Sequence, residues 1–224
     1  MNRTLALFIS VVGHPLLILT YTLLLLLALN PQQFGSLSIA DRHSVLLLIS
    51  VFSTSFLLPG FGVALLKPLG FIKSLQMEDK QERTGAYIIA GVFYLWLFKN
   101  LHTGGQTPPL YQCFVLGATI GLFLAFFINI FTKISAHAVG MGGLLAMLLL
   151  TLRQPEWAKY GLQVGTTGAS LQFSLIVVLA IALIFAGLVG TARLALGAHS
   201  PRDLYRGYAA GIVAVGLAAV IIAV

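Results

Sequence analysis

Two histidines, an aspartate and several basic residues interrupt a chain that is otherwise mostly apolar. The stretch from Thr191 to Gly211 contains Arg193, His199 and Asp203, and the last two are four residues apart. At that spacing a carboxylate can hold one ring nitrogen of a histidine and leave the other as a nucleophile or a base. The arginine adds a cation suited to a bound anion. This stretch is therefore a candidate for chemistry on an anionic substrate.

Two further polar clusters carry matching residue types. The sequence Lys133-Ile-Ser-Ala-His137 lies just before an apolar segment, where a helix N-terminus would offer unpaired N–H groups and a positive dipole to an anion. The stretch from Gln76 to Gly85 is the most polar in the chain, and within it Arg83 stands shortly before an apolar segment. The candidate site therefore draws on three separate parts of the sequence.

Each cluster also has an ordinary structural interpretation. Ser200, Pro201 and Asp203 form a helix-start pattern, so Asp203 can simply cap the last helix. In the second cluster the serine can be an N-cap, the lysine an interfacial side chain and the glycines that follow helix-packing residues. For the glycines we prefer the packing interpretation. Capping does not explain the two histidines or Arg193, which is why a functional site is inferred.

The composition indicates an integral membrane protein. Of the 224 residues 58% are hydrophobic and 8% are charged, and the mean hydropathy is +0.98. Soluble domains contain about 25% charged residues. The net charge of +7 favours anionic lipid headgroups or phosphorylated substrates over nucleic acid, because no soluble domain is expected to carry a basic face. The lone Cys113 excludes an intramolecular disulfide and a multi-cysteine metal site.

Apolar segments near the ~20 residues needed to cross a bilayer recur along the whole chain. They predict an all-α, polytopic helical membrane bundle with six to seven transmembrane helices, in a single domain over residues 1–224. We expect the first segment to be retained, because it is too long for the core of a signal peptide. The seven predicted crossings are Leu5–Leu29, Ser44–Leu66, Gly85–Leu101, Tyr111–Phe131, Ala138–Leu152, Leu171–Leu196 and Leu204–Val224.

The order of these crossings determines which polar clusters can meet. Two crossings separate each of the three clusters from the next, so all three are expected at the same membrane face in either absolute orientation. His14, beside Pro15 within the first crossing, is expected to lie far from that face as a hydrogen-bonded helix residue. Sequence-distant residues are therefore predicted to converge on one side of the bilayer.

Taken together, the clusters resemble the motifs of the type 2 phosphatidic acid phosphatase superfamily, PAP2. Its third motif, Ser-Arg-x5-His-x3-Asp, is matched by Ala192-Arg193, five residues, His199, three residues and Asp203, with only the leading serine lost. Its second motif, Pro-Ser-Gly-His, reads Ile134-Ser-Ala-His137 here. The resemblance covers residues 76–211 and implies a PAP2-like helical core.

The first motif of the family, Lys-x6-Arg-Pro, is the most divergent. Arg83 matches its arginine, but Gln76 stands where the family has lysine and Thr84 where it has proline. The candidates to supply the missing cation are Lys133, Lys80 and Lys73. In the second motif Ala136 adds a methyl group where the backbone should approach phosphate closely. These departures bear on the substrate more than on the chemistry.

The resemblance implies a membrane lipid phosphate phosphatase that forms a phosphohistidine. His199 would attack phosphorus, with Asp203 orienting it. His137 would protonate the leaving oxygen and then help to activate water. The implied substrate is a lipid phosphomonoester or diphosphate such as phosphatidic acid, phosphatidylglycerophosphate or a polyprenyl pyrophosphate, with no cofactor and no metal. The implied substrate-binding residues are Arg83, Arg193, Ser135 and Lys133.

Other functions remain open from the sequence. A catalytically relaxed PAP2-like protein that binds lipid or acts as a scaffold would explain the altered first motif, and a lipid phosphotransferase would use the same residues. A transporter or channel would be expected to spread its charges along a path rather than gather them at one face. A metal site of two histidines and one carboxylate is disfavoured, because the arginines around it would repel a divalent cation. The glycine-rich spans suit a homodimer as well as internal packing.

The distribution of basic residues favours a cytoplasmic site. In the predicted topology nine of the 13 lysine and arginine residues lie on the face of the three clusters, which the positive-inside rule assigns to the cytoplasm. Three of the nine are already explained by phosphate binding, however, and many bacterial relatives of the family work at the outer face. We expect a bacterial inner membrane protein, and the count of basic residues favours a cytoplasmic site over one at the outer face.

Overall fold

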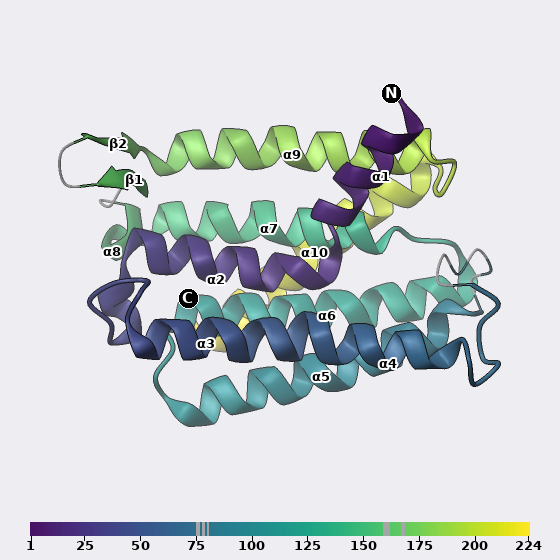
Figure 1. The fold of residues 1–224 in the computed structure, drawn as a ribbon, viewed down its shortest axis with the longest axis horizontal. Coiled ribbons are helices and arrows are strands. Elements are labelled where there is room, and N and C mark those ends of the chain that lie inside the picture. The colour runs from purple at the N-terminus through teal and green to yellow at the C-terminus, as the bar shows by residue number, and fades with distance from the viewer. Residues whose placement is uncertain (75–76, 78, 80, 159–161, 167–168) are drawn as a thin grey trace.

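Long helices run side by side along the longest axis of the molecule and form a bundle (Figure 1). The computed structural model describes residues 1–74, 77, 79, 81–158, 162–166 and 169–224. Within them, six helical segments are long and apolar enough to cross a membrane: Arg3–Leu29, Arg42–Leu66, Pro109–Phe131, Ala136–Arg153, Leu175–Ala195 and Pro201–Ile222. The prediction of a helical, polytopic integral membrane protein with six to seven crossings is confirmed.

The first two segments are composite. Helix α1 (Arg3–Val12) leads through a 3-10 turn (Pro15–Leu17) into α2 (Ile18–Leu29), and a second 3-10 turn (Pro31–Phe34) follows. Helices α3 (Arg42–Phe52) and α4 (Leu58–Leu66) are joined by one π-helical turn (Ser53–Leu57). The remaining helices are α5 (Arg83–Gly104), α6 (Pro109–Phe131), α7 (Ala136–Arg153), α8 (Pro155–Ala158), α9 (Leu175–Ala195) and α10 (Pro201–Ile222).

Helix α5 is as long as its neighbours but is not among the six apolar segments. It contains Arg83, Lys99 and His102, which lower its hydropathy. It nevertheless lies alongside α6 in the bundle (Figure 1). The third predicted crossing, Gly85–Leu101, is therefore a helix packed into the bundle without the apolar character of the others.

The first predicted crossing contains a break at His14. His14 has an extended backbone, with φ −63° and ψ 131°, and its Nδ1 accepts a hydrogen bond from the Leu16 N–H at 3.3 Å. A proline disfavours helical geometry in the residue before it and donates no N–H, so Pro15 ends α1. As a result α1 leaves the axis of α2 and lies across the end of α9 (Figure 1).

The sixth predicted crossing begins too early. Leu171 lies in β2 (Ala169–Phe173), which pairs antiparallel with β1 (Leu162–Thr166) in a hairpin before α9. The helix begins at Leu175, because the Ser174 side chain accepts a hydrogen bond from the Val177 N–H and so caps the helix. The seventh crossing begins earlier than predicted, at Pro201 rather than Leu204. Local capping overrides the hydropathy boundary at the start of α9 and at the start of α10.

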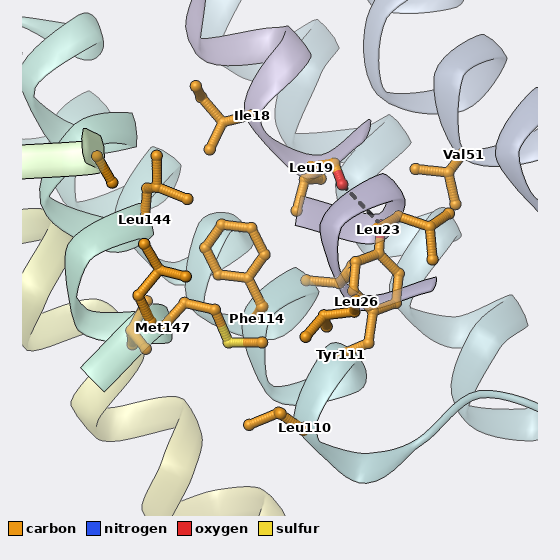
Figure 2. Close-up of a cluster of buried hydrophobic side chains, with 14 of the residues drawn as sticks. Ile18, Leu19, Leu23, Leu26, Val51, Leu110, Tyr111, Phe114, Leu144 and Met147 are labelled. Carbon is orange, nitrogen blue, oxygen red and sulfur yellow. Dashed lines mark hydrogen bonds between the residues drawn. The ribbon is translucent and has the colours of Figure 1, made fainter. Parts of the chain in front are cut away.

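The buried centre of the bundle lies between α2, α6 and α7 (Figure 2). Leu23, Phe114 and Met147 are each at most 2% exposed there. Tyr111 donates its hydroxyl hydrogen to the carbonyl oxygen of Leu19 at 3.1 Å, which satisfies its one polar atom in this apolar setting. Apolar packing between these three helices thus holds α7 in the bundle.

Helices α7 and α10 approach each other at glycines. A Cβ atom on Gly211 would lie 2.1 Å from the carbonyl oxygen of Val139, and one on Gly142 would lie 2.3 Å from that of Tyr208. Backbone atoms cannot yield to such contacts, so only glycine permits this spacing. The packing interpretation of the glycines after His137 is confirmed at Gly142. This contact brings the first turns of α7 and α10 together.

The three polar connections gather at one end of the bundle. In Figure 1 the end of α4 and the start of α5 lie at the right-hand end, together with the α6–α7 and α9–α10 connections and the amino terminus. The opposite end holds the α2–α3 and α5–α6 connections and the carboxy terminus. The prediction that the three clusters share one face is confirmed.

Candidate active site

The start of α10 holds His199 beside Asp203. Ser200 is the N-cap residue: its side chain accepts the Asp203 N–H at 3.4 Å, while Asp203 Oδ2 accepts the Ser200 N–H at 2.9 Å. This reciprocal capping box confirms the structural interpretation of the Ser200-Pro201-x-Asp203 pattern. The same Oδ2 atom lies 3.7 Å from His199 Nδ1. Asp203 therefore caps the helix and faces the histidine at once.

The two nitrogens of His199 have different surroundings. Nδ1 is buried, faces the carboxylate and has no hydrogen-bond partner, and the side chain as a whole is only 4% exposed. At 3.7 Å the Nδ1–Oδ2 pair is within ion-pair distance but longer than a hydrogen bond. A carboxylate at Nδ1 favours a proton there, which leaves the Nε2 lone pair for an electrophile.

His199 is held neutral by its surroundings. Burial, followed by the positive charges of Arg193, Arg83 and Lys133, lowers the pKa of His199 to about 4, and Asp203 opposes that shift. A neutral imidazole has the free lone pair that a nucleophile needs. The three cations lie at the end of α9, at the start of α5 and between α6 and α7, and all of them act on the His199 ring. The site is therefore electropositive, as an anion-binding site should be.

The start of α7 is joined directly to the start of α10. The Ser135 N–H donates to the carbonyl oxygen of Asp203 at 3.3 Å, and the buried Ser135 side chain caps α7 by accepting the Ala138 N–H at 3.4 Å. His137 follows in the first turn of α7 and lies within electrostatic range of His199 and Arg193. The second and third motif clusters thus form one structural unit.

Arg193, in the last turn of α9, reaches into the same region. Its Nη1 donates to the hydroxyl of Ser10 at 2.8 Å, while its Nε is buried with no hydrogen-bond partner. A buried guanidinium nitrogen without a partner is costly, so an acceptor such as a phosphoryl oxygen would satisfy it. Arg83, at the start of α5, interacts electrostatically with Arg193 and donates its Nε–H to the carbonyl oxygen of Met77 at 2.9 Å.

The predicted site residues accordingly fall into two groups. The first group is linked by direct contacts or lies at the adjoining start of α7, end of α9 and start of α10. It contains His199, Asp203, Ser135, His137 and Arg193. Arg83 and Lys133 contribute through their charges at His199. Gln76, which stands at the lysine position of the first motif, lies outside the residues that the structure describes.

Two residues from the first membrane segment also enter the site. Ser10 contacts both Arg193 and His137, and the His14 ring lies 5.5 Å from the His137 ring, centroid to centroid, in an edge-to-face arrangement. The expectation that His14 lies far from the motif face is wrong, because the break before Pro15 turns α1 across the end of α9. His14 is hydrogen-bonded as expected, but it is not a helix residue, because its backbone is extended. In the sequence, Gly13-His14-Pro15 was the signal that could have indicated this break in the first membrane segment.

The site differs from a metal centre in its grouping of side chains. Among the residues that the structure describes, no three His, Cys, Asp or Glu side chains come together as ligands for a metal ion. The groups that do converge are cationic or neutral, with Asp203 as the acidic exception. Such a set suits an anion better than a cation.

Comparison with known families agrees with this chemistry. Residues 128–223 match the family model of the PAP2 superfamily. The matched part includes α7, α9 and α10, and with them the second and third motif clusters, while Arg83 lies before it. No match to the chain was found among curated proteins or among solved structures. The segment that supplies both histidines of the site is therefore similar to the PAP2 superfamily.

Proposed function

We propose that the protein is a lipid phosphate phosphatase that works through a phosphohistidine and without a metal ion. One observation carries the proposal: a buried His199 side chain faces Asp203, and the positive charges of three residues from separate parts of the chain act on the same ring. Phosphoryl transfer spreads negative charge over the equatorial oxygens, so positioning and cationic stabilisation supply most of the catalysis. The match of residues 128–223 to the PAP2 family model supports a phosphatase type of function.

In the first step His199 Nε2 forms a bond to phosphorus while the bond between phosphorus and the lipid oxygen breaks. His137 gives a proton to that oxygen, and the lipid alcohol or the lipid monophosphate leaves. Asp203 stabilises the positive charge that His199 acquires. The side chains proposed to hold the phosphoryl oxygens are Arg193, Arg83 and Lys133, aided by Ser135 and the N–H groups at the start of α7.

In the second step water attacks phosphorus and the bond between nitrogen and phosphorus breaks. His137, now neutral, takes a proton from the attacking water. The electron pair of the broken nitrogen–phosphorus bond returns to His199 Nε2, and inorganic phosphate leaves. The histidine that acted as acid thus acts as base. Atoms and charge balance with water as the only co-reactant.

The setting of the site supports a lipid as substrate. A groove of about 490 Å³ lies between α6 and α10, with Leu124, Ile128 and Val213 among its lining residues. Its polar end is formed by Arg206, one turn along α10 from Asp203, which donates a hydrogen bond to the Thr132 hydroxyl. An apolar groove that ends in a cation next to the site would suit an acyl or prenyl chain beside its phosphate.

The test is phosphate release in detergent from phosphatidic acid, phosphatidylglycerophosphate and a polyprenyl pyrophosphate, with a chelator present. Wild type should release phosphate from at least one of them. His199→Ala should reduce the rate to the background, whereas His43→Ala, which removes a histidine at the other end of the bundle, should leave it unchanged. Activity that survives His199→Ala, or that the chelator abolishes, would contradict the proposal.

The same experiment separates the two other candidates. A lipid phosphotransferase would yield a phosphorylated lipid acceptor in place of inorganic phosphate. A catalytically relaxed lipid-binding protein would bind a lipid phosphate without turnover of any substrate in the panel.

We also propose that the motif end, which is the end of the bundle that carries His199, His137 and Arg83, faces the cytoplasm. The test is labelling of single cysteines introduced at Lys73, at the motif end, and at Gln33, at the opposite end, with a reagent that does not cross the membrane. The native Cys113 is buried and gives a low background. Labelling of the Lys73 position in intact cells would refute this orientation.

A further inference from the structure

We propose that Ser10, in the first membrane helix, is a positioning residue that holds Arg193 and His137 in their working orientations. The inference rests on the proposed function for the roles of those two residues. Ser10 lies far from both along the chain and belongs to neither the PAP2 motifs nor the matched residues 128–223. Its contacts within the site assign it this role.

The fold places Ser10 in the site through the break in the first segment. Helix α1 turns away from α2 at His14 and packs on α9, where a Cβ atom on Gly13 would lie 2.4 Å from a methyl carbon of Val189. This close approach buries Ser10, which is 6% exposed, although Phe8 and Val11 on the same helix remain exposed. A buried hydroxyl on a membrane helix needs partners, and here they are the residues of the candidate site.

The first contact orients the guanidinium of Arg193. The Ser10 hydroxyl oxygen accepts a hydrogen bond from Nη1 at 2.8 Å. A guanidinium is planar, and Nε–H and Nη2 form the edge on the other side of the group from Nη1. Holding Nη1 therefore directs the Nε edge, and Nε is the nitrogen that is buried without a partner. That edge is a two-pronged donor suited to two phosphoryl oxygens.

The second contact determines the protonation of His137. Its Nε2 lies 3.1 Å from the carbonyl oxygen of Ser10 and 3.3 Å from the hydroxyl oxygen. A carbonyl oxygen only accepts, so Nε2 carries a hydrogen in this arrangement. A neutral imidazole has one donor and one acceptor nitrogen, which makes Nδ1 the nitrogen that can take up and give back a proton. Ser10 thus acts on Arg193 through its hydroxyl, and on His137 through its carbonyl oxygen at 3.1 Å with the hydroxyl as the longer contact at 3.3 Å.

This division allows the side-chain role to be tested alone. Ser10→Ala removes the hydroxyl, the shorter of whose two contacts is with Arg193, and keeps the carbonyl oxygen that holds His137 Nε2. We expect kcat/KM for the lipid phosphate to fall by about tenfold, as expected for the loss of a hydrogen bond to a charged group. The affinity for orthovanadate, measured by calorimetry, should fall by a similar factor. The pH dependence of kcat should be unchanged, because the tautomer of His137 is held by the backbone.

Two controls distinguish positioning from damage to the fold. Ser10→Thr restores the hydroxyl and should recover most of the lost kcat/KM. Thr4→Ala removes a hydroxyl from the exposed side of the same helix and should match wild type. In an Arg193→Lys background, Ser10→Ala should cost less than about twofold, because residues that act through each other are not additive.

The outcomes separate this inference from the proposed function. If wild type releases phosphate and Ser10→Ala matches it in kcat/KM and in orthovanadate affinity, the positioning role is wrong. It is also wrong if Ser10→Ala costs as much in the Arg193→Lys background as in wild type. If wild type releases no phosphate but binds orthovanadate more tightly than Ser10→Ala does, the positioning role holds and the phosphatase proposal fails. If wild type neither releases phosphate nor binds orthovanadate, both fail.

Discussion

Replacing Asp203 by asparagine separates its two roles in the structure. The amide oxygen of asparagine can still accept the Ser200 N–H bond that Asp203 Oδ2 now accepts at 2.9 Å, and asparagine is a favourable residue near a helix N-terminus. The negative charge that faces His199 Nδ1 at 3.7 Å is lost. We therefore expect phosphatase activity to fall while the fold persists.

The size of the effect follows from the distance. At an effective dielectric constant of about 20, opposite unit charges at about 4 Å attract by roughly 4 kcal/mol. In the proposed mechanism His199 gains positive charge as the nitrogen–phosphorus bond forms, so this attraction is present in the transition state and absent in the neutral resting state. Its loss should lower kcat by roughly 10²–10³-fold, since about 1.4 kcal/mol corresponds to a factor of ten.

The assay is the initial rate of phosphate release at saturating lipid phosphate in detergent, with thermal unfolding of each variant measured in parallel. Ser200→Ala is the matched control: it removes the capping hydroxyl and keeps the carboxylate. It should lower stability by about 1 kcal/mol and change kcat by less than a few fold. A kcat for Asp203→Asn within tenfold of wild type would show that the carboxylate does not stabilise a charged His199, and the mechanism would have to be abandoned.

The remaining predictions concern pH and packing. The pKa of His199 is lowered to about 4 in the folded protein. The stability that the neutral histidine contributes is therefore present above about pH 6.5 and is lost as the pH falls toward 4. Between these pH values the unfolding temperature should depend less on pH in His199→Asn than in wild type. Arg83→Gln removes one of the charges that lower this pKa, so the acid limb of kcat/KM should move to higher pH, and an unmoved limb would place Arg83 outside the site. Gly211→Ala puts a methyl group against the Val139 carbonyl, so it should lower the free energy of unfolding by about 1–3 kcal/mol and reduce activity. Gly216→Ala, on the same helix, meets open space and should leave the unfolding temperature unchanged or raise it.

Several features of the site follow from local sequence chemistry. Ser200-Pro201 and Asp203 predict the start of α10, and Ser135 predicts the start of α7, because capping depends on side chains within one turn of the helix end. The four-residue separation of His199 and Asp203 places the ring and the carboxylate together for the same reason. Counting the apolar segments predicts that the polar connections share one end of the bundle.

Other features depend on which helices touch. The number of crossings says at which end a residue lies, but it does not say which helices are neighbours. The contact of α7 with α10 at Gly142 and Gly211 requires two surfaces that fit each other, and neither glycine on its own identifies its partner. The entry of Ser10 and His14 depends on the direction that α1 takes after the break at Pro15, which is determined by its packing on α9.

The sequence by itself determined the class of the protein, the capped starts of its helices and the residue types of the candidate site, because apolar length, capping and close spacing act over short stretches of chain. Only the tertiary structure decided that Ser10 contacts Arg193 and His137 and that His14 lies beside the site. Such contacts join residues more than a hundred positions apart, and they depend on the packing of whole helices rather than on the chemistry of any one segment.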